Sequence, residues 1–397
     1  MAEIRTPDAP LVSVTVTTYN RASLVTASID SVLAQTYPHF EVIVVDDGST
    51  DDTPRVIQDR YGSRVRYLRQ ENQGPAGARN TAIRASRGKY IAFHDDDDMW
   101  LPRKLERQVE ALERHPECAL SYCACLEATP EGENTGRVYG NSGRGRSGDI
   151  FALFLRRCVI LEPAAIIRAS VLEQVGLFDA ELPAGKDTDF FLRVLMQYPA
   201  VYVREPLALI REHPQRKTLS DRRRGRTFQA QERTMLKLLD MLPLERARER
   251  PLVVRRLLAA KLGLLELRAG ELAWQDFAGE LVEVARALQD TAGEHHLCQA
   301  AAGAVKHWAH AERAQPVAPP SPQQLAALVE ALAAAGAATS GRVRSRAAYL
   351  YAALALSGPG EGTFGGLSWL GRAARRSLPA AVAHCAWAVA QRLMSGG

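Results

Sequence analysis

The chain has 397 residues, of which 46% are hydrophobic, so it can form a sizeable core and suggests two domains more readily than one. The formal net charge of +5 is too small to indicate a nucleic-acid-binding protein, which would carry a strong basic stripe. The six cysteines form no CxxC pair and no zinc-site spacing, and they are expected to be reduced core residues of a cytosolic protein. No secretory signal and no transmembrane helix are expected from the hydrophobicity pattern.

Apolar runs alternate with helical patterns through roughly the first hundred residues. The predicted strands fall within residues 11–20, 40–45, 65–68 and 90–93, and the predicted helices within 22–36, 53–60 and 76–86. The strands are continuously apolar instead of alternating in polarity. This β-α-β order therefore indicates an α/β fold in which a parallel sheet is covered by helices on both faces.

Three polar motifs follow predicted strands. They are TTYN at residues 17–20, DDGS at 46–49 and DDDD at 95–98. Ligands of parallel α/β sheets bind beyond the carboxyl ends of the strands. We therefore expect the three motifs to converge on one crevice, although they lie far apart in the sequence.

The rest of the chain changes in character twice. A helix is predicted at 102–114, a loop or flap at 129–148, mixed structure at 149–213, and a stiff proline-rich linker at 315–323. From about residue 227 onward Ala, Leu, Arg and Glu dominate, which predicts a mainly α-helical C-terminal region. The expected domains are residues 1–226 and 227–397.

The DDDD motif, Asp95 to Asp98, crowds four carboxylates directly behind an apolar run. Such a cluster suits a hard divalent cation with oxygen ligands, and Mg²⁺ or Mn²⁺ would also hold phosphates. If the segment is extended, Asp95 and Asp97 point to one side and Asp96 and Asp98 to the other. The alternatives are a solvated acidic turn, or Asp98 as the cap of the helix that starts near Pro102.

The other motifs are less specific taken singly. Carboxylates in DDGS can accept hydrogen bonds from a base or a ribose, or they can cap the next helix. Tyr19 can stack on a base, although TTYN is also an ordinary strand-end turn. Near Gly185, either Asp187 or Asp189 can cap a helix, or a carboxylate there can serve as a general base.

Three segments together resemble the inverting family 2 glycosyltransferases, which have the GT-A fold. They are VSVTVTTYNRASLVTASIDSVLAQTYPHFEVIVVDDGSTDDT, NQGPAGARNTAIRASRGKYIAFHDDDDMWLPRKLERQ and VGLFDAELPAGKDTDFFLRV. The resemblance covers roughly residues 11–215. It implies a Rossmann-like domain that transfers a sugar from a nucleoside diphosphate.

The resemblance assigns roles to matching positions. Those implied to bind the nucleotide are Thr17, Tyr19, Asn20, Asp47, Arg79 and Asp96. Asp95 and Asp97 match the DxD pair that binds a divalent metal, Mn²⁺ or Mg²⁺, and the diphosphate. His213 resembles a histidine that often completes the metal site, with an ordinary loop residue as the alternative. Asp187 falls on the carboxylate that activates the acceptor.

One position departs from the family pattern. The family commonly has Glu-Asp where this chain has Lys186-Asp187. An ammonium beside Asp187 would lower the pKa of that carboxyl and weaken it as a base. Lys186 can instead face the acceptor and pair with an acidic group. The sequence leaves both alternatives open.

The expected function is an inverting, metal-dependent glycosyltransferase, most readily UDP-sugar-dependent, that acts on a glycan or lipid-linked acceptor in bacterial surface polysaccharide biosynthesis. A nucleotidyltransferase is an alternative, but it would usually carry a Gly-rich basic loop where this chain has TTYNRAS. The Lys186 departure keeps a non-catalytic sugar- or nucleotide-binding module open.

Two basic segments bear on location. Arginines and lysines cluster within residues 211–226, and an arginine- and tryptophan-containing segment spans 364–394. Both segments can contact an anionic membrane. The alternative for residues 211–226 is a solvated linker, and the alternative for residues 364–394 is a terminal helix packed on its own domain. We expect a cytoplasmic protein, with peripheral contact at the inner face of the membrane and homo-oligomerisation as further options.

Overall fold

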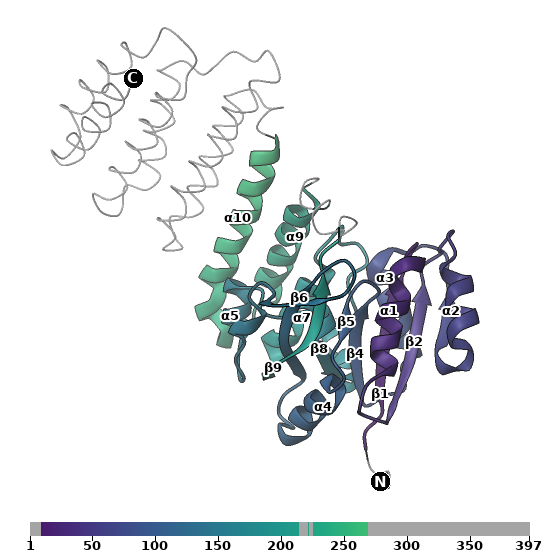
Figure 1. Cartoon of the computed structure of the whole chain (residues 1–397). Coiled ribbons are helices and arrows are strands. Elements are labelled where there is room, and N and C mark those ends of the chain that lie inside the picture. Colours follow the sequence, from purple (N-terminus) through teal and green to yellow (C-terminus); the bar gives the residue numbers. More distant parts are fainter. Residues whose placement is uncertain (1–8, 214–220, 222–224, 269–397) are drawn as a thin grey trace, which may run out of the picture. The chain divides into compact units, whose positions relative to one another are not determined.

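The computed structural model describes residues 9–213, 221 and 225–268 of the chain (Figure 1). Most of the basic cluster after residue 213 lies outside these residues, as do the predicted linker at 315–323 and the segment 364–394. The prediction of a helical region up to residue 397 is therefore addressed only as far as residue 268.

Nine strands form one sheet in the order β3-β2-β1-β4-β8-β6-β9-β5, with β7 paired to β6. The strands are β1 (Val12–Thr18), β2 (Phe40–Asp46), β3 (Arg66–Arg69), β4 (Tyr90–Asp95), β5 (Met99–Trp100), β6 (Leu120–Ala128), β7 (Asn134–Val138), β8 (Ala165–Arg168) and β9 (Ala200–Arg211). β1 pairs in parallel with β2 and β4, and β2 pairs in parallel with β3. The predicted parallel sheet is thus confirmed for the first four strands.

The helices are α1 (Ala22–Leu33), α2 (Thr53–Tyr61), α3 (Gly74–Ala85), α4 (Lys104–Arg114), α5 (Phe151–Arg156), α6 (Leu172–Val175), α7 (Lys186–Gln197), α9 (Arg226–Met241) and α10 (Arg250–Arg268). Val42 and Val44 of β2 join the core cluster that contains α1, α2 and α4. The residue between them in sequence, Ile43, packs instead with Ala78 and Ala82 of α3. Because successive strand residues face opposite sides, helices cover both faces, as predicted.

An aromatic cluster attaches α7 to the sheet. Phe93 of β4 makes edge-on contacts with Phe178, Phe190 and Phe191, and its ring centroid lies 5.4 Å from that of Phe178. The rings of Phe178 and Phe190 stack with centroids 4.3 Å apart. Aromatic pairs of this kind add about 0.5–1.5 kcal/mol each beyond the burial of their area. The start of α7 is thereby held beside the end of β4.

The second half of the sheet is mixed. β8 runs antiparallel to β4 and β6, while β6 and β9 are parallel. The segment 129–148, predicted to be a loop or flap, contains the strand β7, whose five residues are all exposed. Its Gly- and Asn-rich sequence hides the strand, because β7 is held by pairing with β6 and not by buried side chains.

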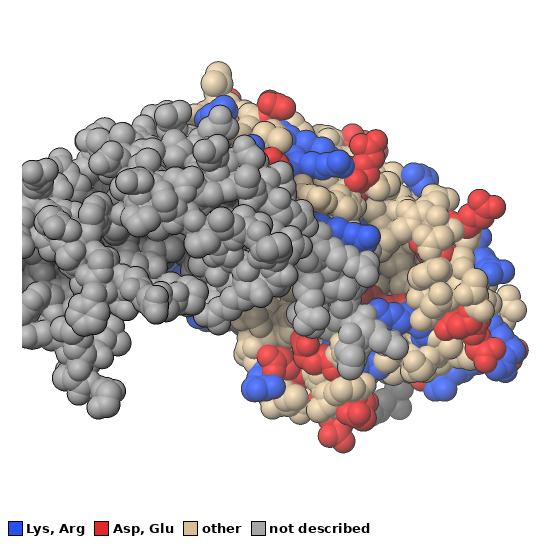
Figure 2. All heavy atoms as spheres, turned by 90° about the horizontal axis from the view of Figure 1, so that it is seen from above, with Lys and Arg blue, Asp and Glu red and all other residues tan. Residues whose placement is uncertain are grey.

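Contacts divide the chain into two compact units, residues 1–230 with 242–247 and residues 231–241 with 248–397. The described part of the second unit consists of most of α9 and α10, which fits the prediction of helix there. None of the described helices is long and apolar enough to cross a membrane. On the described surface in Figure 2, basic and acidic side chains are interspersed.

Gly88, between α3 and β4, permits a close approach of β1. A Cβ at this position would lie 2.6 Å from the backbone nitrogen of Ser13 and 2.7 Å from the carbonyl oxygen of Leu11. Because backbone cannot move aside cheaply, we expect Gly88→Ala to lower the free energy of unfolding by about 1–3 kcal/mol. Urea unfolding measures this. Arg84→Ala, an exposed change on α3, is the control, and equal midpoints for the two variants would contradict the prediction.

Candidate functional site

The carboxyl ends of β1, β2 and β4 meet at one edge of the sheet. Thr18 of β1 is in register with Asp46 of β2, and Thr17 is in register with Asp95 of β4. The backbone N–H of Asp47 donates a hydrogen bond to the carbonyl oxygen of Thr18, at 2.9 Å. The three polar motifs therefore meet at one edge of the sheet, as predicted; the crevice itself stays a prediction.

Asn20 ties the loop after β1 to the loop after β2. Its φ is +52°, a left-handed conformation that asparagine adopts more readily than most residues. Its side-chain oxygen accepts hydrogen bonds from the backbone N–H groups of Thr50 and Asp51, at 2.8 and 3.3 Å. Asn20 thus holds the loop in place, and its contact with a nucleotide stays a prediction. The neighbouring Tyr19 is 46% exposed, so its ring is open to stacking.

The loop after β3 orients Asp47. One carboxylate oxygen of Asp47, Oδ1, accepts hydrogen bonds from Gln70 Nε2 at 2.8 Å and from the backbone N–H of Gln73 at 2.9 Å. Gly48 has φ of +86°, and a Cβ there would lie 3.1 Å from the backbone nitrogen of Asn72. Glycine therefore lets this loop come close enough to fix the carboxylate. Binding of a base by Asp47 stays a prediction.

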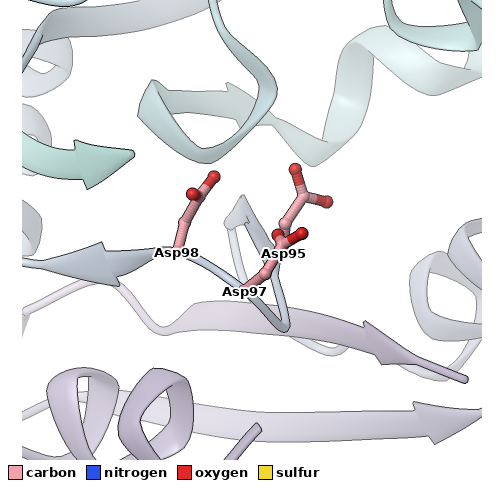
Figure 3. A group of neighbouring side chains, drawn as sticks. All are labelled: Asp95, Asp97 and Asp98. Atoms are coloured by element: carbon pink, nitrogen blue, oxygen red, sulfur yellow. The ribbon is translucent and has the colours of Figure 1, made fainter. Parts of the chain in front are cut away.

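The four aspartates form a tight turn at the end of β4. The N–H of Asp98 points back to the carbonyl oxygen of Asp95, at 3.3 Å. As Figure 3 shows, Asp95, Asp97 and Asp98 lie together, with one carboxylate oxygen of each within 4.8 Å of the others. The prediction that Asp98 points away from this pair is wrong, because the chain stops being extended at Asp95. Asp96 is buried.

Asp98 also does not cap α4. The residue at the N-cap is Arg103, whose side chain makes no capping hydrogen bond, and the N–H of Leu105 in the first turn donates to Gln35 Oε1 at 2.9 Å. The carboxylate of Asp98 instead accepts the backbone N–H of Arg211 in β9, at 3.1 Å. This bond attaches the end of β9 to the acidic turn, so the residue that follows shortly after, His213, is brought to the site.

Basic side chains of the protein surround the turn. Arg79 contacts Asp95 at 2.8 Å, Arg21 lies 3.6 Å from Asp97, and His213 Nε2 lies 3.0 Å from the same Asp97 carboxylate. The expectation that a divalent cation alone makes the acidic cluster tolerable is therefore too narrow. His213 reaches the acidic turn, which favours the resemblance over an ordinary loop residue; its role as a metal ligand stays a prediction.

Burial, followed by the charge of Glu162, raises the pKa of Asp95 to about 6. Burial and the adjacent Asp97 raise the pKa of Asp96 to about 7. The nearby guanidinium groups therefore do not fully offset burial and mutual repulsion at Asp95 and Asp96. Three clustered carboxylates with an imidazole beside them are the ligand types that Mg²⁺ and Mn²⁺ accept, so the residues present fit such an ion.

Two carboxylates at the start of α7 have different surroundings. Gly185, with φ of +62°, is the N-cap residue, so neither Asp187 nor Asp189 occupies the N-cap position. Asp189 pairs with Arg193 at 2.9 Å, and Arg193 in turn donates to the carbonyl oxygen of Leu177 at 2.7 Å. Asp189 therefore holds the preceding loop. This leaves Asp187 as the acidic residue of this helix end that is suited to chemistry.

Lys186 forms an ion pair with Glu162, which is buried. Burial raises the pKa of Asp187, the Lys186 ammonium lowers it as the next largest effect, and Glu162 raises it; the net result is a raised pKa. Lys186 was expected either to lower the pKa of Asp187 or to pair with an acidic group of the acceptor. It does pair with an acidic group, but this group is Glu162 of the protein itself. Asp187 keeps a raised pKa despite its neighbour.

Arg79 differs most from its expected role. It was expected beside the nucleotide, but its side chain is fully buried and donates to the carbonyl oxygens of Thr15 and His94 as well as to Asp95. Sequence reasoning missed Arg21, Arg211, Gln70 and Glu162. The one available signal was Glu162 itself, a lone acidic residue in the apolar run VILEPAAII.

A half-parallel sheet with an acidic turn at the end of its fourth strand, and a carboxylate at the start of a helix packed beside that strand, is the arrangement of the GT-A class of sugar transferases. The chain belongs to glycosyl transferase family 2, and residues 13–176 match the model of that family. An uncharacterised glycosyltransferase from Haemophilus influenzae is 30% identical over 214 residues, which cover 53% of this chain and 71% of that protein.

Two further comparisons agree. The Escherichia coli protein WfgD, a UDP-Glc:alpha-D-GlcNAc-diphosphoundecaprenol beta-1,3-glucosyltransferase, is 43% identical over 106 residues, 26% of this chain and 42% of WfgD. The crystal structure of S. aureus TarS 1–349 with UDP-GlcNAc has the same fold, with a TM-score of 0.59 and 18% identity, and the match covers 76% of this chain and 90% of that 1–349 chain. The chain spans only 26–30% of the length of longer Rickettsia glycosyltransferases that it matches.

The raised pKa values predict that metal binding depends on pH. As the pH falls through about 7 and 6, Asp96 and Asp95 take up protons, and a protonated Asp95 would be a poor ligand for a metal ion. We expect Mn²⁺ affinity to fall by about tenfold between about pH 8 and about pH 5.5 in calorimetric titrations. Asp97→Asn should abolish binding, whereas Asp59→Asn, an exposed change on α2, should not. An affinity that is the same at both pH values would contradict the prediction.

Proposed function

We propose that the protein transfers a sugar from a nucleoside diphosphate donor, with UDP as the nucleotide, to an acceptor hydroxyl with inversion at the anomeric carbon. The observation that carries this is the meeting of Asp47, the acidic turn and the start of α7 around one edge of the sheet. Asp47 is tied to β1, Asp95 is in register with β1, and α7 is attached to β4. The donor and the acceptor would meet between these carboxylates.

The nucleotide end of the site is formed by the loops after β1 and β2. Asp47 accepts an N–H of the base, and the exposed Tyr19 ring stacks on it. Thr17 and Asp96 lie beside the ribose and phosphates, and Asn20 keeps the loop closed through its backbone bonds. Arg79 contributes through Asp95, because its guanidinium is occupied inside the protein.

The metal end is formed by the acidic turn and the end of β9. Asp95, Asp97 and His213 hold a divalent ion, Mn²⁺ or Mg²⁺, and Asp98 keeps this end of β9 in place. When bound, the ion supplies positive charge to the diphosphate that leaves.

Asp187 acts at the acceptor end. Its carboxylate takes the proton from the acceptor hydroxyl as that oxygen attacks the anomeric carbon, and the bond from this carbon to the diphosphate oxygen breaks. The nucleoside diphosphate leaves with the bonding electron pair, and the new glycosidic bond lies on the opposite face of the sugar. A single displacement of this kind needs no covalent intermediate with the protein.

The names of the relatives support the choice of substrates. WfgD is named for a UDP-sugar donor and a lipid diphosphate acceptor, and TarS was crystallised with UDP-GlcNAc. TuaG of Bacillus subtilis, 43% identical over 117 residues, is named for teichuronic acid biosynthesis. We therefore propose a UDP-sugar donor, a glycan or lipid-linked acceptor, and a place in bacterial surface polysaccharide synthesis. A cytoplasmic enzyme at the inner face of the membrane, with its transferase domain at residues 1–226, fits this role.

Replacing the base tests the catalytic role. We expect Asp187→Asn to lower kcat for UDP release with Mn²⁺ by about 10²- to 10⁴-fold, because the amide cannot accept the proton of the acceptor. Affinity for UDP should stay near that of the wild type. Asp59→Asn removes an exposed carboxylate of α2 and should leave kcat unchanged. A fully active Asp187→Asn enzyme would remove Asp187 from the mechanism.

The pH dependence of turnover tests the environment of Asp187. Its pKa is raised above the ordinary value of 3.8, and a base works only when ionised, so activity should rise with pH through this elevated pKa. Because the Lys186 ammonium lowers the pKa of Asp187, Lys186→Met should move the acid limb of the kcat profile to higher pH. An acid limb that moves to lower pH would show that Lys186 acts in another way.

A further inference from the structure

Glu162 joins two cations that belong to different parts of the site. Its Oε1 lies 2.6 Å from Nε of Arg79, and its Oε2 pairs with the Lys186 ammonium. The Glu162 side chain is only 5% exposed. Each carboxylate oxygen therefore meets a different positive charge in a place from which water is nearly excluded.

The network continues to the acidic turn. Arg79, with no exposed surface, also contacts Asp95 at 2.8 Å through Nη2 and donates to the carbonyl oxygen of Thr15 at 2.8 Å through Nη1. Lys186, Glu162, Arg79 and Asp95 thus form a chain of alternating charges. It runs from the start of α7, next to Asp187, to the turn at the end of β4.

The backbone around Glu162 is fixed by neighbours. Glu162 opens the short helical turn η3 (Glu162–Ala164) before β8. Trp100 Nε1 donates to the carbonyl oxygen of Pro163 at 2.8 Å, and Gln108 Nε2 donates to that of Ala164 at 2.9 Å. Glu162 is therefore held on a rigid support, as a residue that orients others must be.

The pairing explains how a lysine is tolerated at position 186. A largely buried ammonium without a partner would be strongly disfavoured. Beside Asp187, it would form an ion pair with that carboxylate and lower its pKa. Glu162 supplies the missing anion. It also balances the charge of Arg79, whose other ion pair is with Asp95.

We propose that Glu162 is the positioning residue of this transferase. It holds the Lys186 ammonium on a carboxylate other than Asp187, and through Arg79 it orients Asp95. Glu162 thereby couples the acceptor end of the site to the metal end. The proposal rests on the proposed function, in which Asp95 and Asp187 serve those two ends.

A double-mutant cycle tests the coupling. Glu162→Gln and Lys186→Glu should each lower kcat for UDP release by about 10- to 100-fold, the usual effect of removing a residue that orients ligands. Lys186→Glu places two carboxylates against each other, so the double variant, which removes one of them, should be faster than Lys186→Glu alone. Lys186→Arg should keep most of the activity. Losses that simply multiply in the double variant would overturn the proposal.

The matched control is Lys89, which pairs with Glu113 on the surface, with side chains 49% and 43% exposed. Lys89→Glu should leave kcat unchanged. If Glu162→Gln fails to fold, Glu162→Asp keeps the charge but shortens its reach. It should lose activity while its melting temperature stays near that of the wild type, and an unchanged kcat in a folded Glu162→Asp would overturn the proposal.

Mn²⁺ affinity, measured by titration without donor, separates this proposal from the proposed function. In Glu162→Gln the charge of Arg79 is left to Asp95 alone and competes with the metal, so affinity should fall by about 10-fold or more. If the wild type releases no UDP from any donor, the proposed function fails while this titration still decides the role of Glu162. Wild-type Mn²⁺ affinity in a folded Glu162→Gln variant would overturn the proposal.

Discussion

The structure depends on compensating the negative charge that four consecutive aspartates bring to one strand end. Carboxylates this close repel one another, and burial makes each charge more costly. The protein places Arg21, Arg79 and Arg211 around the turn: Arg21 directly precedes α1, Arg79 belongs to α3 and Arg211 to β9. These long-range contacts bring the start of α1, α3 and β9 to the end of β4. The site and the fold are therefore stabilised by the same contacts.

The sheet provides the rigid frame for this compensation. Parallel pairing of β1 with β2 and β4 brings three polar strand ends to one edge, where Asp47 and Asp95 belong to neighbouring strands. The antiparallel strand β8 then returns along β4 and delivers Glu162 from the side opposite to β1. A purely parallel arrangement would place that residue at the other edge of the sheet. The mixed second half is thus what allows one carboxylate to reach both Arg79 and Lys186.

The sequence predicted those features of the fold that depend on residues close together in the chain. Continuous apolar strands, the helices between them and the meeting of their polar ends followed from periodicity and from the geometry of parallel sheets. The alternation rule failed at Asp98, because a turn replaces extended backbone there. Glu162 and Arg211 were missed because their partners lie far away in sequence, 24 residues away for Lys186 and 113 for Asp98. No short motif encodes such pairs; only the three-dimensional arrangement reveals them.

The same charge balance constrains how ligands enter. Without ligands, the four aspartates already face three guanidinium groups and His213, and the raised pKa of Asp96 favours a proton as well. A divalent ion that arrived alone would leave an excess of positive charge, which burial penalises. A diphosphate that arrives with the ion restores the balance, since its oxygens carry the opposite charge. Metal and nucleotide binding should therefore stabilise each other, because each removes the charge that makes the other unfavourable.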